Sequence, residues 1–288
     1  MARGISLHIG LNSVDPNQYG GNALPLNACE FDAQDMESIA ASQGFATKLL
    51  LTQNAHSVAV KHAIDAAAGQ LQPGDIFFLT YSGHGSNIDD SDFDEADGKD
   101  ETWVLYDRNL IDDELYLHWS RFRPGVRVLV VSDSCHSGTV VRAMENEESR
   151  VDEFNAIWCL PVIQKKYEAE SAPLPRTVPF ILQARHYVER EELYKAIKAA
   201  NAPGERSIVG ASVMLISACQ DSQLAGDGQR NGVFTRLLRH IWNDGGFVGD
   251  YQSFYTRIRS ISPMSQVPNL YKVGQPNDAF ESESPFFI

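Results

Sequence analysis

The sequence predicts an α/β protein with a mostly parallel central sheet and helices on both faces. Three apolar runs at residues 76–81, 126–131 and 212–217 have the composition of strands that are buried on both faces. Segments with helical periodicity separate these runs from one another and from a first strand at 4–12. In such sheets, ligands bind beyond the carboxyl ends of the strands.

The remaining elements follow from caps and breaks in the pattern. A helix is expected over 27–43, with Asn27 as its cap and Gly44 at its end. Pro73-Gly74 ends a second helical pattern. Further elements are expected as follows: a short strand over 47–51, helices over 55–69, 187–200, 231–243 and 250–261, and an apolar run over 268–273.

Length and proline content predict one domain, 1–288, in three parts. The chain of 288 residues is long enough for one large α/β domain. Residues 142–206 are rich in charge and proline and interrupt the strand–helix rhythm, so they form an insertion between 1–141 and 207–288.

Composition excludes several classes of protein. The net charge of −14 argues against nucleic-acid binding, which needs clustered Lys and Arg, but it suits basic substrates. We expect neither a signal peptide nor a membrane span, because no apolar stretch approaches the roughly 18 residues that a spanning helix needs. The four cysteines are too sparse for a disulfide scaffold, which favours a reduced, cytoplasmic location.

Two short motifs carry the chemistry. Tyr-Ser-Gly-His-Gly at 81–85 and Ser-Asp-Ser-Cys-His-Ser-Gly at 132–138 each follow a predicted buried strand. The first supplies His84 and the second Cys135, and a thiol needs a nearby base to become a nucleophilic thiolate. Each residue alone has a simpler interpretation, as a turn histidine or as an inert buried cysteine such as Cys159. Together they predict a catalytic dyad.

The surroundings of Cys135 predict a reactive thiol. Its neighbours are Ser, Asp, His and Gly, and a helix beginning near Thr139 together with an imidazole would lower its pKa. The backbone N–H groups of Gly85 and Cys135 are candidates for an oxyanion hole. His136 should point away from the reaction and is interpreted as structural.

Other hydrolytic and nucleotide-binding chemistries are not supported. No Gly-x-Ser-x-Gly motif surrounds the serines of the two segments, so a serine hydrolase of the common α/β kind is not expected. Neither zinc-ligand spacing nor a Walker-type glycine loop is present.

These motifs resemble those of the metacaspases and their prokaryotic relatives, the orthocaspases, within the caspase-like cysteine peptidases. The likeness includes segments at 8–12, 29–32, 216–221 and 232–235, and leaves out 142–206. The separation of 51 residues between His84 and Cys135 is close to the about 50 typical of caspases. The resemblance implies a caspase-like fold, with 1–141 similar to a large subunit and 207–288 to a small one.

The family implies peptidase activity after Arg or Lys. A basic side chain needs a carboxylate to receive it, and Asp133 lies two residues before the nucleophile. By similarity, Asp32 is the second carboxylate, and Ser82 and Cys29 line the same pocket. From the residues alone, Asp32 is equally well interpreted as a favourable charge in the first turn of a helix.

The resemblance also raises calcium binding, although no cofactor is expected to be obligatory. Residues 89–101 are rich in carboxylates suited to calcium, but they do not follow the EF-hand pattern and are also typical of a solvated loop. By similarity, Asp100, Asp112 and Asp113 are the ligand candidates. Arg142 stands where many relatives have a further acidic ligand.

Self-cleavage in the insertion is a further implication of the family. Exposed basic residues in such a segment would be natural substrates, and Lys165, Lys166 and Arg176 are the processing candidates. Most basic residues there must nevertheless be ordinary surface charges. Relatives of this type are generally monomers, and a monomer is expected here.

The sequence therefore predicts a cysteine endopeptidase of metacaspase type with basic P1 specificity. His84 acts as general base and then as acid, and Cys135 forms a thioester. Its partners would be peptides or proteins with Arg or Lys at P1, and neither nucleic acid nor membrane. The alternatives are a caspase-fold scaffold without activity and a thiol hydrolase acting on other amides or esters.

Overall fold

The computed structural model describes residues 2–89, 99–135, 174–200, 209–219 and 224–288. A six-stranded sheet forms its centre, in the order β11-β9-β7-β3-β1-β2, and its strands are parallel except for β11 at one edge. The strands are β1 (Gly4–Gly10), β2 (Ala46–Leu51), β3 (Ile76–Ser82), β7 (Arg127–Asp133), β9 (Ser212–Ser217) and β11 (Asn269–Gly274).

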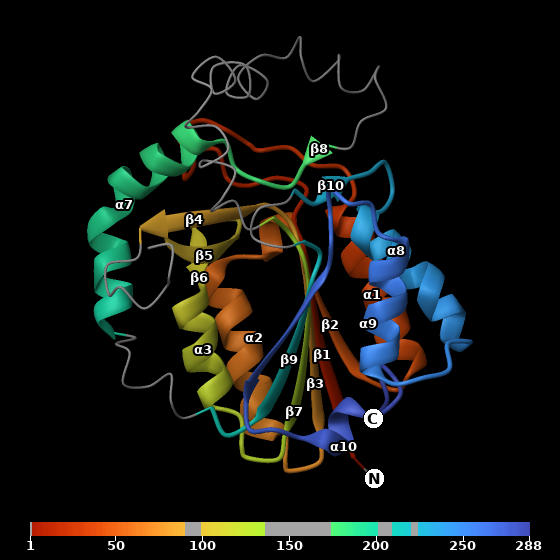
Figure 1. Ribbon diagram of the computed structural model, residues 1–288. Helices are drawn as coiled ribbons and strands as arrows, with labels where there is room; N and C mark the ends of the chain where they lie inside the picture. Colours follow the sequence, from red (N-terminus) through yellow and green to blue (C-terminus); the bar gives the residue numbers. More distant parts are fainter. Residues whose placement is uncertain (1, 90–98, 136–173, 201–208, 220–223) are drawn as a thin grey trace.

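Helices cover both faces of this sheet (Figure 1). One apolar core forms against α2 (Ser57–Gln70) and α3 (Asp112–Ser120). The other forms on the opposite face, against α1 (Cys29–Ser42), α8 (Val233–Trp242) and α9 (Tyr251–Ile261). The central strands β3 and β7 are buried along their whole length, as their uninterrupted apolar runs predict. The predicted mostly parallel sheet with helices on both faces is therefore confirmed.

Most predicted elements lie within a few residues of their expected positions, but the predicted helix cap is wrong. Helix α1 begins at Cys29 with Ala28 as its cap residue, and no side chain of the cap accepts a hydrogen bond. The backbone N–H groups of Asn27 and Ala28 instead donate to the carboxylate of Asp227, at 2.7 and 3.2 Å. The first-turn N–H of Glu30 donates to Asn12 Oδ1 at 3.2 Å, so Asn12 supplies the capping oxygen and Asp227 fixes the residues just before the helix.

Three smaller elements surround the carboxyl ends of the central strands. A second sheet contains β4 (Gly85–Asp89), β5 (Lys99–Val104) and β6 (Asn109–Ile111). A two-residue strand β8 (Leu174–Pro175) pairs with β10 (Gly226–Asp227), and α7 (Phe180–Ala200) follows β8. Figure 1 shows β8 and β10 at the end of the sheet opposite the two chain termini.

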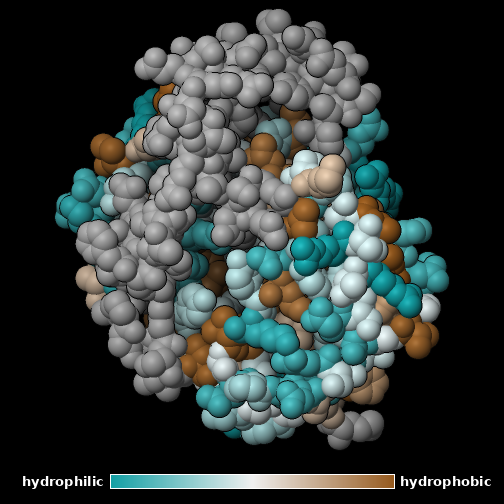
Figure 2. All heavy atoms as spheres, viewed as in Figure 1, coloured by the Kyte–Doolittle hydropathy of each residue, from teal (hydrophilic) through white to brown (hydrophobic). Residues whose placement is uncertain are grey.

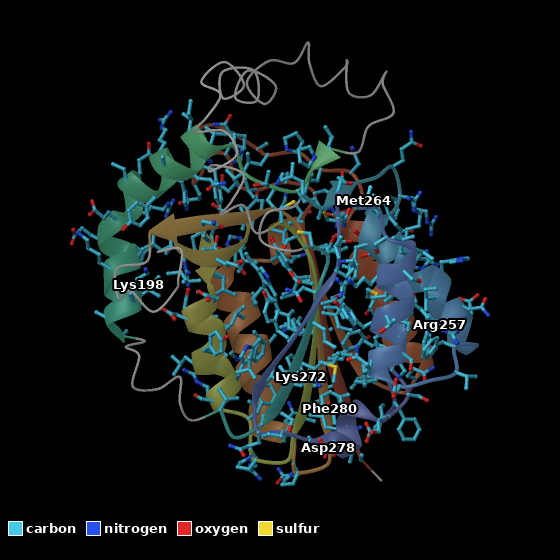
Figure 3. The ribbon with its side chains drawn as sticks, viewed as in Figure 1. Lys198, Arg257, Met264, Lys272, Asp278 and Phe280 are labelled. Atoms are coloured by element: carbon cyan, nitrogen blue, oxygen red, sulfur yellow. The ribbon has the colours of Figure 1, made fainter. Side chains whose placement is uncertain are left out.

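Strand register brings the functional motifs together. Ser82 and Asp133 are the last residues of β3 and β7 and pair directly, while Gly10 at the end of β1 pairs with Ser82. Because these strands are parallel, the segments containing His84 and Cys135 leave the same edge of the sheet. In Figure 3, the labelled residues Asp278 and Phe280 lie near the opposite end of the sheet.

On the face of the molecule that is turned to the viewer in Figure 2, the described residues are mostly hydrophilic, with scattered apolar patches. Single exposed apolar residues such as Val248 and Met264 are ordinary features of a water-facing surface. Among the described helices, none has the length and apolar character that a membrane span requires.

Candidate active site

Arg176 lies at the centre of the site, with its side chain 0% exposed. Its segment runs antiparallel to β10, where Leu174 and Pro175 pair with Asp227 and Gly226. The Arg176 N–H donates to the carbonyl of Ala225 at 2.9 Å, which continues this pairing by one residue. The segment therefore enters the site as an added strand, which is a common way for extended peptides to bind.

The carbonyl oxygen of Arg176 accepts two backbone hydrogen bonds. The N–H of Gly85 donates to it at 3.0 Å, and the N–H of Cys135 donates at 3.3 Å. These are the two N–H groups that the sequence predicts for an oxyanion hole. Two converging N–H donors on one carbonyl are the arrangement that stabilises negative charge on that oxygen during acyl transfer.

Three carboxylates from different parts of the chain surround the Arg176 guanidinium. Its Nη2 donates to Asp32 Oδ2 at 2.6 Å and to Asp227 Oδ1 at 2.9 Å. Its Nη1 donates to Ser82 Oγ at 2.9 Å and lies 3.0 Å from Asp133 Oδ2. Burial alone would lower the pKa of Arg176, but these carboxylates raise the pKa well above its ordinary value.

Helix α8 holds two of these carboxylates at its amino end. Asp133 Oδ2 accepts hydrogen bonds from the N–H and the hydroxyl of Thr235, at 3.1 and 2.7 Å. Asp32 Oδ1 accepts from the N–H of Gly232 at 3.0 Å, and Oδ1 also accepts from the Asn231 amide. Free N–H groups and the helix dipole favour negative charge at this position.

The predicted pocket residues thus lie together. Ser82 Oγ donates to Asp32 Oδ2 at 2.8 Å, so the hydroxyl connects this carboxylate to the guanidinium. Cys29 is also buried there, and burial raises the pKa of its thiol well above the ordinary range, whereas the Arg176 charge lowers it.

Sequence reasoning missed Asp227. It is buried between Arg176 and the amino end of α1, with hydrogen bonds to both. Its neighbours, Gly226 and Gly228, form no recognisable motif, and it lies 51 residues from Arg176 in sequence. An isolated aspartate in a glycine-containing turn is the only local signal.

Cys135 is buried, and its thiol contacts the backbone of Ala225. The Ala225 N–H donates to Cys135 Sγ at 2.7 Å, and Sγ lies 3.5 Å from the Ala225 carbonyl. Burial raises the pKa of the Cys135 thiol well above its ordinary value, and a hydrogen bond with Cys219 adds to the rise. The expected lowering of this pKa is therefore wrong for this state, because the thiol is buried against Ala225 and Cys219, away from water.

His84 is buried beside the Arg176 segment. Its Nε2 lies 3.0 Å from the carbonyl oxygen of Leu24, which holds the ring in place. Burial lowers the pKa of His84 to about 4, against an opposing contribution from that carbonyl. With a high thiol pKa and a low imidazole pKa, the neutral pair is the favoured form in the covered site.

Two glycines allow the close approaches in this site. A Cβ on Gly85 would lie 1.6 Å from the carbonyl oxygen of Cys135, so a side chain here would separate the two N–H donors. A Cβ on Gly232 would lie 2.6 Å from both terminal nitrogens of Arg176. The absence of a side chain at 232 is what leaves space for a guanidinium.

The predicted calcium ligands lie in β5 and directly after β6, the strand that pairs with it. Thr102 pairs with Ile111, so Asp112 and Asp113 begin α3 near the strand that contains Asp100. Among the described residues, no group of three His, Cys, Asp or Glu side chains is arranged to hold a metal ion. The Asp100 side chain lies outside what the structure describes, so the calcium site stays a prediction.

Several other predicted residues also lie outside the described residues. They include the processing candidates Lys165 and Lys166, and Cys159, which is interpreted as inert. They also include His136, which follows the nucleophile, and Arg142, which stands where many relatives have an acidic calcium ligand. Arg176, the third processing candidate, is described, and it occupies the predicted substrate pocket.

Comparison with known proteins identifies the family. The caspase domain family model matches residues 13–280, so this chain belongs to the caspase domain family. Metacaspase-1 of Eremothecium gossypii is 28% identical over 256 residues, which cover 82% of this chain and 55% of that protein. Metacaspase-1 of Mycosarcoma maydis is 27% identical, covering 80% of this chain and 59% of the relative. The chain therefore spans little more than half the length of these relatives.

Solved structures agree with this assignment. A crystal structure of a Geobacter sulfurreducens protein is 43% identical and covers 99% of this chain and 98% of its own, with a TM-score of 0.83. Caspase-1 from Spodoptera frugiperda is 10% identical, covers 94% of this chain and 86% of its own, and has a TM-score of 0.50. The second likeness concerns the fold alone, and the predicted caspase-like fold is confirmed.

The pocket predicts an acidic limit to activity. The pKa of Asp32 is raised to about 6, because burial and the charge of Asp133, which raise it, outweigh Arg176 and Asn231, which lower it. When the guanidinium leaves, Asp32 loses a contribution that lowers its pKa, while entering water weakens the burial that raises it. A protonated Asp32 holds a cation poorly, so kcat/KM for an Arg peptide should fall as the pH drops through that pKa.

This limit is measured as a pH profile of kcat/KM between pH 5 and 8. Asp32→Asn should have a much lower kcat/KM at every pH, and its profile should lack the fall at acidic pH, because the titrating group is gone. A fall that persists unchanged in the variant would assign the titration to another group.

Proposed function

We propose that this chain is a cysteine endopeptidase that cleaves peptide bonds after Arg or Lys. The observation that carries this proposal is the arrangement of Arg176, whose carbonyl accepts from the N–H groups of Gly85 and Cys135 while its side chain lies among carboxylates. A P1 residue requires both contacts at once. Membership of the caspase domain family supports the same activity.

In the proposed reaction, Cys135 is the nucleophile and His84 the general base. The Cys135 thiol loses its proton to His84, and the sulfur attacks the P1 carbonyl carbon, whose oxygen gains negative charge beside the two N–H donors. His84 then gives the proton to the leaving amine, which leaves a thioester. Water attacks the thioester with His84 as base, which releases the acid and restores the thiol.

We also propose that the Arg176–Thr177 bond is a self-cleavage site. The support is that the backbone N–H, the side chain and the carbonyl of Arg176 all make the contacts expected of a bound P1 residue. Beyond it, the Val178 N–H donates to the carbonyl of Gly85 at 3.1 Å, so the chain continues along the same site. In the uncut chain this segment fills the pocket and competes with other substrates.

Calcium activation, a cytoplasmic location and a monomeric state stay predictions of the family resemblance. The placement of Asp112 and Asp113 near the end of β5 is the structural support for calcium. Calcium bound there would lie next to the β4–β5 pairing, which begins at Gly85.

Peptide hydrolysis tests the activity. Matched fluorogenic peptides ending in Arg, Lys or Asp should be cleaved only after the basic residues, because the carboxylate pocket holds a cation. Cys135→Ala should remove all cleavage, and assays with added calcium or with a chelator measure calcium dependence. Absence of turnover under every condition, including after cleavage of 176–177 by an added protease, would favour the scaffold alternative.

Self-cleavage is tested by incubating the purified chain and determining the fragments by mass and N-terminal sequencing. We expect a new N-terminus at Thr177, lost in both Cys135→Ala and Arg176→Gln. Arg185→Gln is the matched control, because this arginine is exposed and pairs only with Glu189 among the described ion pairs. A wild-type chain cut elsewhere, or Arg176→Gln still cut after residue 176, would contradict the assignment.

A further inference from the structure

Asp227 lies beside the edge of the Arg176 guanidinium that carries Nε and Nη2. Its Oδ1 accepts from Nε at 3.3 Å and from Nη2 at 2.9 Å. The same oxygen also accepts from the N–H of Ala28 at 3.2 Å, and Oδ2 accepts from the N–H of Asn27 at 2.7 Å, both just before α1. Asp227 is therefore held in one orientation, with one oxygen toward the P1 side chain.

The nitrogen positions in the pocket distinguish the two basic side chains. Arginine has five N–H donors in a planar fork, whereas lysine has one ammonium at the end of a flexible chain. Here Nη2 lies between Asp32 and Asp227, and Nη1 lies against Asp133. A single ammonium cannot occupy these positions together. It would leave a buried carboxylate without a cation, which is costly.

We propose that Asp227 makes this pocket select a guanidinium over an ammonium. This inference rests on the proposed peptidase function and refines its substrate class to peptides with arginine at P1. Asp32 and Asp133 supply a general attraction for positive charge, while Asp227 accepts the Nε–H that only arginine offers. Lysine peptides are then poor substrates.

The test compares kcat/KM for two peptides that differ only in P1, Leu-Pro-Arg and Leu-Pro-Lys. In the wild type the Arg:Lys ratio should be at least about thirtyfold, the effect expected when a buried charge loses its partner. Asp227→Asn should lower the rate for Arg and leave the rate for Lys nearly unchanged, so that the ratio falls at least about tenfold. Asp32→Asn is the comparison, and it should lower the rates for both peptides.

The ratio separates specificity from a general structural effect. Asp227 also accepts hydrogen bonds at the start of α1, and Asp227→Ser, which keeps a capping oxygen, replaces Asp227→Asn if the latter does not fold. A wild-type ratio near one, or a ratio unchanged in a folded variant, overturns this inference alone. Absence of cleavage of either peptide overturns the proposed function instead.

A second inference comes from the residues that follow the Arg176–Thr177 bond. Val178 is 4% exposed and packs in an apolar cluster with Val14, Tyr19, Leu24 and Val104. The Tyr19 side chain is fixed in this cluster, because its hydroxyl donates to the Leu105 carbonyl at 2.7 Å.

We infer that this cluster is an apolar subsite for the second residue after the cleaved bond, the P2′ position. The Val178 N–H donates to Gly85, the residue whose own N–H donates to the Arg176 carbonyl. The subsite therefore has a fixed register relative to the reacting carbonyl. It suits a peptide with a branched aliphatic P2′ residue, and it should reject a charged one because the charge would be buried without a partner.

Internally quenched peptides Leu-Pro-Arg-Thr-Val and Leu-Pro-Arg-Thr-Asp test this subsite with the full chain. The Val peptide should have a kcat/KM at least about tenfold higher. Val14→Phe should reduce this preference by filling the subsite, whereas Val248→Phe, at a residue 83% exposed, should not.

The chain's own Val178 is a competing occupant, so the pair of peptides is also measured in Val178→Asp. A Val preference that appears only in this variant supports the subsite and shows that the chain's own valine occupies it after self-cleavage. Equal rates for both peptides in the wild type and in Val178→Asp overturn the inference. If neither Arg peptide is cleaved, the proposed function fails instead.

Discussion

The buried ion cluster around Arg176 is the interaction on which the site depends. One guanidinium and the carboxylates of Asp32, Asp133 and Asp227 lie together away from water. Removing such charges from water costs several kcal/mol per ion, so the cluster persists only where every charge is well paired. The cluster also connects β7, the starts of α1 and α8, and the β8–β10 pair, which no single apolar contact does.

Helix ends are what make the excess of negative charge tolerable. Three carboxylates face one cation, and each also accepts an N–H group at the amino end of α1 or α8, although the second oxygen of Asp133 is buried with no hydrogen-bond partner among the described residues. These N–H groups have no partners within their own helices, so each carboxylate satisfies a donor while the dipole offsets its charge. When the cation leaves, the same pocket must take up a proton or another cation. A basic substrate is therefore favoured by the fold itself.

The sequence is most informative where the chemistry is local and least where it depends on contacts across the chain. Buried runs at β3 and β7 predict both central strands, and their ends place His84 and Cys135 at one edge of the sheet. Asp133 is predictable because it lies two residues before the nucleophile. Asp227 is not, since its role arises only when β10 pairs with β8 beside α1. The wrong cap at Asn27 has the same cause, because Asn12 and Asp227, both distant in sequence, accept the N–H groups at the start of α1.

Substrate recognition and the state of the dyad are connected through water. The Arg176 carbonyl accepts from the backbone N–H of Cys135, and Cys135 and His84 are both buried in this state, which moves the thiol pKa up and the imidazole pKa down. Both shifts disfavour the thiolate–imidazolium pair, and both should decrease when the Arg176 segment leaves and water enters. A tethered segment has an effective concentration in the millimolar range, so free peptides compete poorly with it. Cutting the chain after Arg176 removes the tether on one side, and release of the new end would then open the pocket and restore a reactive thiol in the same event.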